Sequence, residues 1–308
     1  MNTRLFLILA TAAIVLAGCN KDENEKDNWN GEIRLASGVT VLQSRVNSDD
    51  VPDKQIAGDE LIGVHVSDAT TAEALYANIS AKADGNGQFS VYSTTMYYPQ
   101  SGNDVKIIAY HPHDSGTDDE YDFTVAKDQS VATAYYAADL LYSAEATYPR
   151  SKTACSLTFA HKLAKVVCTL RAGDGLNAGD LTGATVEIIT PERAVKFNRK
   201  TGDITTAGTS ANSDNVKLGE YGAIVAPQTF TKSTKFLKVT LPTGGELYYT
   251  LPADNDPDTQ GDQDLVLAGG NVYTFNITVK LTGLTVTSTI TPWTQITAVD
   301  GNATMDDK

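Results

Sequence analysis

Short runs in which apolar and polar residues alternate recur along this chain, and they constrain its fold more than any other feature. The clearest run is residues 272–281, where every second side chain is apolar: Tyr273, Phe275, Ile277, Val279 and Leu281. Successive side chains of a strand point to opposite faces, so this run predicts one buried and one solvated face. Gly, Asn, Asp and Pro separate such runs at short intervals, and no long amphipathic helix is evident. We therefore expect a mainly β chain.

Further runs predict additional strands, and their shortness favours β-sandwiches. They span residues 61–66, 88–91, 105–110, 155–159, 165–170, 185–189, 217–225, 236–241 and 246–251. One stretch, 132–142, reads as a helix, although its end at Asp139-Leu140-Leu141-Tyr142 equally suits the start of a strand.

The N-terminus carries an apolar run, residues 5–15, that ends in Leu16-Ala17-Gly18-Cys19. These eleven residues, at about 1.5 Å each in a helix, are too few to cross a bilayer core of about 30 Å. Residues 1–18 are therefore predicted to be a signal peptide. A cysteine directly after Ala-Gly is typical of bacterial lipoproteins, so we expect lipid on Cys19, including palmitate. The alternative is a free or buried cysteine beside an ordinary cleavage site.

A polar segment follows the lipidated position, because residues 20–27 contain no apolar side chain and cannot pack. We expect residues 19–31 to form a flexible acidic tether. Two or three acyl chains hold a protein on a membrane, which here would be the outer membrane. The lysine and acids behind Cys19 resemble a surface-export signal, and a generic linker explains them nearly as well.

Length and charge set two further limits. Removal of residues 1–18 leaves 290 of the 308 residues, a length that favours two domains. We expect one β-sandwich at 32–150 and a second at 151–308. The formal net charge of −14, with scattered lysines and arginines, argues against nucleic acid as a partner.

Two cysteines remain after Cys19. In an exported chain, Cys155 and Cys168 are candidates for a disulfide. The competing interpretation is that they are two small apolar residues on neighbouring strands, since no CxxC motif or nearby histidine indicates a redox or metal site.

Several motifs occur in a characteristic order along most of the chain. They are the cysteine signal, an early strand ending at Arg45, GDELIGV at 58–64, YYP at 97–99, DLLY at 139–142, LTFAHKLAKV at 157–166, APQ at 226–228, GNVY at 270–273 and ITPW at 290–293. This order resembles the fimbrillins, the pilins and related lipoproteins of the type V pilus. The resemblance implies two transthyretin-like Greek-key β-sandwiches, export as a lipoprotein, and cleavage by an arginine-specific protease. It also implies strand exchange with other pilus subunits and a role in cell adhesion.

The first strand has the properties that such a mechanism needs. Its apolar residues fall at odd positions and share one face, with Ser37 as a small residue among them: Ile33, Leu35, Val39 and Val41. Removing residues 32–45 would lose four apolar contacts of about 1.5 to 3 kcal/mol each. The sum of about 6 to 12 kcal/mol rivals the net stability of a domain. A strand from another subunit would repair the empty groove by donor-strand complementation.

Cleavage is expected between Arg45 and Val46. Arg45 lies just past the alternating strand and before residues 46–56, a polar stretch predicted to be exposed. Arg34, Arg150 and Arg193 are alternative targets. An uncut chain would remain anchored to the membrane.

A candidate donor strand, residues 284–298, lies near the C-terminus. Its alternate residues repeat the order apolar, apolar, Ser, apolar: Leu284, Val286, Ser288 and Ile290. The alternative is that 284–298 is the last strand pair of its own sandwich, which suits an anchor or tip subunit better than a stalk subunit.

Enzyme motifs are absent from the sequence, since GxSxG, GxxxxGK and HExxH do not occur, and we expect neither catalysis nor a cofactor. His111-Pro112-His113 lacks further zinc ligands, and His161 suits a hydrogen-bonded core residue. The glycine-rich loop 173–178 lacks a following helix to bind phosphate. The acidic loop 254–264 departs from a calcium loop at Thr259 and Leu265, so a solvated turn is the better interpretation.

The sequence thus predicts a non-enzymatic pilus subunit. The rival is a monomeric surface lipoprotein that binds glycan or host protein, with tyrosines as stacking platforms: Tyr97, Tyr98, Tyr135 and Tyr136.

Overall fold

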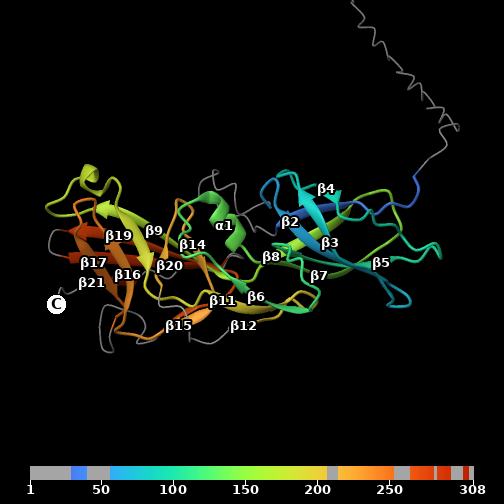
Figure 1. Ribbon diagram of the computed structural model, residues 1–308. Coiled ribbons are helices and arrows are strands. Elements are labelled where there is room, and N and C mark those ends of the chain that lie inside the picture. The colour runs from blue at the N-terminus through green and yellow to red at the C-terminus, as the bar shows by residue number, and fades with distance from the viewer. Residues whose placement is uncertain are drawn as a thin grey trace, which may run out of the picture. The chain divides into compact units, whose positions relative to one another are not determined.

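Strands dominate the computed structural model of this chain, which describes residues 29–39, 56–206, 214–252, 264–280, 283–292 and 301–304. The expectation of a mainly β fold is confirmed. The described residues from 31 onward belong to one unit, whose strands are labelled in Figure 1. Within the described part, no helix is both long and apolar enough to cross a membrane.

The N-terminal half builds a seven-stranded sheet. Its strands, in spatial order, are β1 (Leu35–Val39), β8 (Cys155–His161), β7 (Leu141–Tyr148), β5 (Val105–His111), β2 (Leu61–Asp68), β3 (Ala74–Ala83) and β4 (Phe89–Tyr92). All neighbouring pairs are antiparallel except β1 and β8, which are parallel. Because hairpins join only antiparallel strands, this one pair requires a long connection through the rest of the sheet.

Two more sheets form a sandwich in the C-terminal half. One contains β13 (Val216–Lys217), β10 (Thr185–Ile188), β16 (Lys235–Thr240) and β17 (Glu246–Thr250); the other contains β14 (Ala223–Val225), β9 (Ala164–Ala172), β19 (Asn271–Lys280), β20 (Gly283–Pro292) and β21 (Gly301–Thr304). Phe236 of the first and Phe275 of the second meet in a common core, with ring centroids 5.1 Å apart. The alternation predicted for 272–281 is confirmed over β19, since its odd positions from Tyr273 to Val279 are buried, and Leu281 lies outside the described residues.

Shorter elements complete the fold. β6 (Glu120–Thr124), β11 (Ala194–Asn198) and β12 (Ile204–Thr206) form a three-stranded sheet, and β15 (Gln228–Phe230) pairs with β18 (Leu265–Leu267). Among the described residues, the helices are α1 (Ala132–Ala138) and the short 3-10 helix η2 (Ala178–Leu181). An aromatic core that includes Tyr110, Tyr142 and Phe197 joins β5 and β7 to β11.

Some predicted boundaries differ from the structure. The stretch 132–142 contains both predicted elements, because α1 ends at Ala138 and β7 begins at Leu141. The predicted strand 217–225 is broken into β13 and β14 by a turn between Gly219 and Gly222, which bond each other in both directions. β8, just past the predicted domain boundary at 150, belongs to the seven-stranded sheet, and β6 pairs with β11. Strands from the two sides of that boundary therefore share sheets.

Candidate functional site

The first strand occupies a groove in the seven-stranded sheet, and its first wall is β8. The register of the parallel pair runs from Leu35 opposite Cys155 to Val39 opposite Phe159. The amide of Cys155 donates to the carbonyl of Arg34 at 2.7 Å. This ladder fixes one side of β1 to the backbone of β8.

The second wall of the groove is the segment 87–98, at the opposite end of the sheet. Ile33 donates its amide to the carbonyl of Met96, and Ser37 donates to that of Gly87, both at 2.8 Å. Isolated bridges join Glu32 to Tyr97 and Ala36 to Gln88 in antiparallel fashion. β1 therefore bridges the two ends of the seven-stranded sheet and closes it.

The apolar face of the first strand is turned into the protein. Ile33 and Leu35 are each 1% exposed. The alternate residues of β8 and the nearby wall are also buried: Cys155, Leu157, Phe159, Phe89 and Met96. Burial of two such side chains contributes roughly 3 to 6 kcal/mol. Empty, the groove would expose a continuous apolar floor.

At the middle of the second wall, a tyrosine hydroxyl takes the place of a backbone acceptor for β1. The amide of Leu35 donates to Tyr92 Oη at 3.2 Å, and this hydroxyl donates to the carbonyl of Phe89 at 3.1 Å. Burial raises the pKa of Tyr92 above its ordinary value. The hydroxyl thus remains a neutral group that can accept one bond and donate another.

The groove also contains a cysteine thiol. Cys155 Sγ lies 3.4 Å from Tyr98 Oη, and Tyr98 donates to the carbonyl of Pro149. Burial raises the pKa of the Cys155 thiol, and burial likewise raises that of Tyr98. A protonated, enclosed thiol reacts slowly while the groove is filled.

Cys155 and Cys168 are both free, so the disulfide considered from the sequence is not formed. The reason is topological: Cys155 lies on β8 of the seven-stranded sheet, whereas Cys168 lies on β9 of the five-stranded sheet. Burial raises the pKa of Cys168 to about 12. The two thiols report on different parts of the fold.

Several predicted site residues lie outside the described residues. They are Cys19, Val41, Arg45 and Val46, together with most of the acidic loop 254–264. Described residues of the first strand end at Val39, so the structure follows the chain to within six residues of Arg45.

The described part of the candidate donor strand, residues 284–292, is paired within its own sheet. β20 pairs with β19 along its whole length, from Gly283 opposite Lys280 to Pro292 opposite Asn271. Leu284 and Val286 are buried in the C-terminal core, Ser288 is half-buried, and Ile290 is 43% exposed. Leu284 and Val286 would therefore lose buried contacts in the C-terminal core if this strand left its sheet, whereas Ile290 would lose little.

Comparison with known proteins gives the family. A family model described as Fimbrillin-like matches residues 44–293, which is most of the chain. The chain belongs to the fimbrillin-like family. A Bacteroides uniformis protein designated fimbrium subunit Fim1C is 27% identical over 309 aligned residues, covering 96% of each chain.

Solved structures share the fold of this fimbrillin-like protein. A protein of Bacteroides uniformis designated a cell adhesion protein has a TM-score of 0.64 and 24% identity, covering 86% of this chain and 98% of its own. A Bacteroides ovatus protein with the same designation has a TM-score of 0.66 and 20% identity, covering 86% and 99%.

Two histidines have close polar partners in this fimbrillin-like chain: His111, considered above as a zinc ligand, and His161, expected to be a hydrogen-bonded core residue. His111 Nδ1 lies 2.8 Å from the carbonyl of Asp139, and His161 Nδ1 lies 2.7 Å from its carboxylate. Among the described residues, no cluster of three or more His, Cys, Asp or Glu is placed to hold a metal ion.

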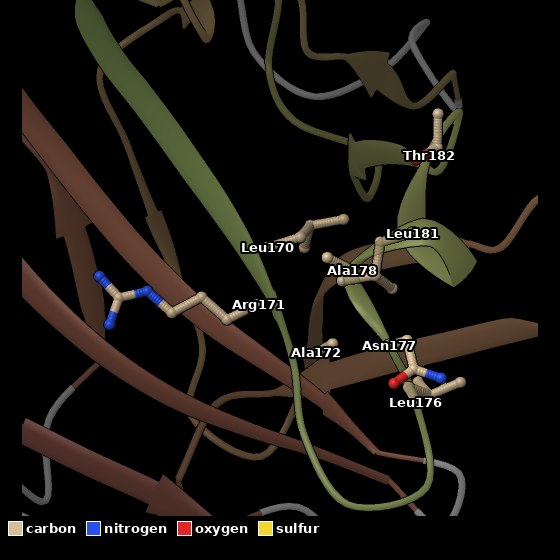
Figure 2. A pocket seen from close by; sticks show the side chains of 8 residues that line it. All are labelled: Leu170, Arg171, Ala172, Leu176, Asn177, Ala178, Leu181 and Thr182. Carbon is tan, nitrogen blue, oxygen red and sulfur yellow. The ribbon is translucent and has the colours of Figure 1, made fainter.

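A hollow of about 680 Å³ lies between β9 and η2, beside the glycine-rich loop 173–178. Figure 2 shows Leu170 and Leu181 lining it while Arg171 points away on the opposite side of β9. η2 has four residues, and Asn177 and Asp180 cap it with their own side chains. Five of its eight lining residues are apolar, and the polar ones are Arg171, Asn177 and Thr182.

One polar cluster of the fimbrillin-like fold is not predicted by any sequence pattern. Arg199, 1% exposed, donates to Asp114 Oδ1 at 2.9 Å and to the carbonyl of Gly116 at 2.8 Å. Its guanidinium carbon lies 4.8 Å from the ring centroid of Tyr121. A surface arginine and a buried one look alike in a β sequence, so only tertiary structure reveals this cluster.

Proposed function

We propose that this chain is a structural subunit of a type V pilus that polymerises when its first strand is replaced by a strand from another subunit. In this account Cys19 carries lipid to the outer membrane, and an arginine-specific protease then cuts between Arg45 and Val46. The subunit has no catalytic role, and its fibres support adhesion.

The observation that carries the proposal is the place of β1 between two walls. Cleavage after Arg45 separates Ile33 and Leu35 covalently from the rest of the fold while they still fill the groove. Hydrogen bonds from Ile33 to Met96, from Leu35 to Tyr92 and from Ser37 to Gly87, together with the pairing to β8, then hold the first strand only noncovalently. An equivalent strand offers the same bonds, so exchange restores them.

The proposed donor is the C-terminal segment 284–298. Its alternating residues match the first strand if Leu284 replaces Ile33 and Val286 replaces Leu35. In the structure Leu284 and Val286 are buried against β19, so donation requires β20 to leave its sheet. Burial of the same side chains in the next subunit's groove offsets the loss of their contacts with β19. Exchange is therefore favoured only where an empty groove is present.

The proposal is tested with residues 20–308, treated briefly with an arginine-specific protease and followed by N-terminal sequencing and size-exclusion chromatography. We expect Val46 as the new N-terminus and a ladder of oligomers. The variant Arg45→Lys should remain monomeric, whereas the control Arg34→Lys should behave as the parent. A chain that is cut after Arg45 and stays monomeric contradicts the proposal.

A second candidate function is an uncut anchor or tip subunit, or a monomeric surface lipoprotein that binds glycan or host protein. The observation in its favour is the full pairing of β20 with β19. The tyrosines considered as glycan platforms support it less, because Tyr98 is 5% and Tyr135 2% exposed. Resistance of Arg45 to the protease would favour this candidate.

A further inference from the structure

Backbone contacts between β1 and the second wall of the groove are interrupted at the middle of the wall, where the side chain of Tyr92 takes their place. The bridges at Glu32 with Tyr97 and at Ala36 with Gln88 advance four residues along the first strand and nine along the wall. The wall therefore bows away from β1 between its two contacts. Backbone carbonyls receive the amides of Ile33 and Ser37, while Leu35 donates to the Tyr92 hydroxyl.

A β-bulge turns Tyr92 into this position. Pairing of β3 with β4 shifts between Ala81 opposite Tyr92 and Lys82 opposite Ser90, so Val91 has no partner in the ladder. Val91 has φ of +48°, rare for a β-branched residue, and its side chain is 74% exposed. Bulges re-aim side chains, and here the strained residue faces solvent while its neighbour reaches the groove.

We propose that Tyr92 is a positioning residue that selects the strand filling the groove by requiring a free backbone amide at its centre. For an incoming strand this inference rests on the proposed function. Any strand that fills the groove must turn three alternate backbone amides toward the wall, as Ile33, Leu35 and Ser37 do. Proline is excluded at the position of Leu35, because proline has no N–H. Residues 284–290 contain no proline, and Pro292 lies beyond the matched positions.

The first test uses the intact chain, residues 20–308, and its two native thiols. Cys155 reports opening of the groove and Cys168 reports opening of the C-terminal sandwich, when labelled peptides are quantified by mass spectrometry. Loss of one hydrogen bond of about 0.5 to 1.5 kcal/mol corresponds to a roughly two- to tenfold change. Tyr92→Phe should raise the labelling rate of Cys155 by this factor and leave Cys168 unchanged.

The matched control is Tyr76→Phe. Tyr76 accepts the amide of Tyr97 in the same wall but bonds no amide of β1 among the described contacts. It should change the Cys155 rate less than twofold. Equal effects of Tyr92→Phe and Tyr76→Phe, equal acceleration of both thiols by Tyr92→Phe, or no acceleration at all would each overturn the proposal.

The second test asks whether Tyr92 also accepts a backbone amide from an incoming strand. A peptide of residues 31–41 is added during proteolysis of the intact chain, and so is its analogue with the Leu35 amide replaced by an ester. In the parent protein, the ester analogue should inhibit assembly roughly two- to tenfold less well than the peptide. In the Tyr92→Phe protein, the ester and the peptide should inhibit assembly equally well. An equal ester penalty in both proteins overturns the proposal. Absence of any assembly contradicts the proposed function and leaves the thiol result to decide the role of Tyr92 toward β1.

Discussion

Leu35 lies opposite Cys155 in the parallel pair of β1 and β8, and both side chains are buried, at 1% and 3% exposure. One belongs to a strand joined to the body of the fold through the segment that contains Arg45. The other belongs to the permanent wall. Removal of the first strand would uncover the strand that bears Cys155, so this thiol can be used to observe that event.

Leu35→Ala should destabilise the uncut chain strongly. Truncation of a buried leucine leaves a cavity and costs about 2 to 5 kcal/mol. Urea unfolding followed by circular dichroism measures the difference. The control Leu61→Ala, at a position 40% exposed on β2, should cost about 1 kcal/mol or less. Equal losses in the two variants would show that Leu35 contributes no more than a surface residue.

Arg199→Met should destabilise the fold by about 2 to 4 kcal/mol, at the low end of values for broken buried pairs because Asp114 is partly exposed. The change removes the buried guanidinium as donor to the carbonyl of Gly116 and the carboxylate of Asp114, which keep the bonds from Asn78 Nδ2 and from the amide of Gly116. Lys200→Met removes an exposed pair with Asp119 and should cost less than about 1 kcal/mol. Denaturant midpoints of the two variants check this, and a reversed order contradicts it.

His65 should make the fold less stable in acid. Burial, and then the charges of Lys200 and Arg199, lower the pKa of His65 to about 4, and its Nδ1 accepts the amide of Asn78. Between the unfolded pKa of about 6.5 and pH 4, the unfolded chain binds a proton that the folded chain does not. Stability contributed by neutral His65 is therefore complete above pH 6.5 and falls below it, by at most about 1.4 kcal/mol per pH unit.

His65→Asn retains an acceptor near Nδ1 and does not titrate. Urea unfolding from pH 4.5 to 7.5 should show a shallower acid decline for the variant, with the two curves parallel above pH 7. Identical slopes below pH 6.5 would show that His65 is not a source of acid sensitivity.

Gly63→Ala should cost about 1 to 3 kcal/mol, because a Cβ there would lie 2.2 Å from the ring of Tyr110. Gly179→Ala has no heavy atom within 4 Å of the added carbon and should change stability by less than about 0.5 kcal/mol. Thermal unfolding of both variants measures the contrast. A Gly63→Ala protein as stable as the parent would mean that the Tyr110 ring can move at little cost.

The sequence predicts the parts of this fold that depend on local periodicity. β19 is found where alternation places it, because a half-buried strand records its burial in every second residue. The break between β13 and β14 was missed, since a run of apolar residues around Gly219 and Gly222 reads as one strand. The strand is interrupted there by a tight turn in which backbone atoms approach each glycine closely, and Gly222 has φ of +93°.

Long-range relationships could not be obtained in this way. The alternation of Ile33 and Leu35 predicts a buried face but says nothing of β8 as the partner, because pairing depends on contacts between distant segments. The role of Tyr92 depends on a bulge at Val91, and valine carries no local signal for positive φ. The free thiols are explained only once β8 and β9 are seen in different sheets.

In the proposed mechanism, a strand of one subunit replaces β1 of the next. A direct test is crosslinking in the cut protein between native Cys155 and an introduced cysteine, in a Cys168→Ala background, with a short bifunctional thiol reagent. We expect intersubunit crosslinks between Cys155 and Val286→Cys after cleavage at Arg45, few with Thr287→Cys on the opposite face, and none in uncut protein. Polymers that form without any crosslink from Val286→Cys to Cys155 of another subunit would contradict it.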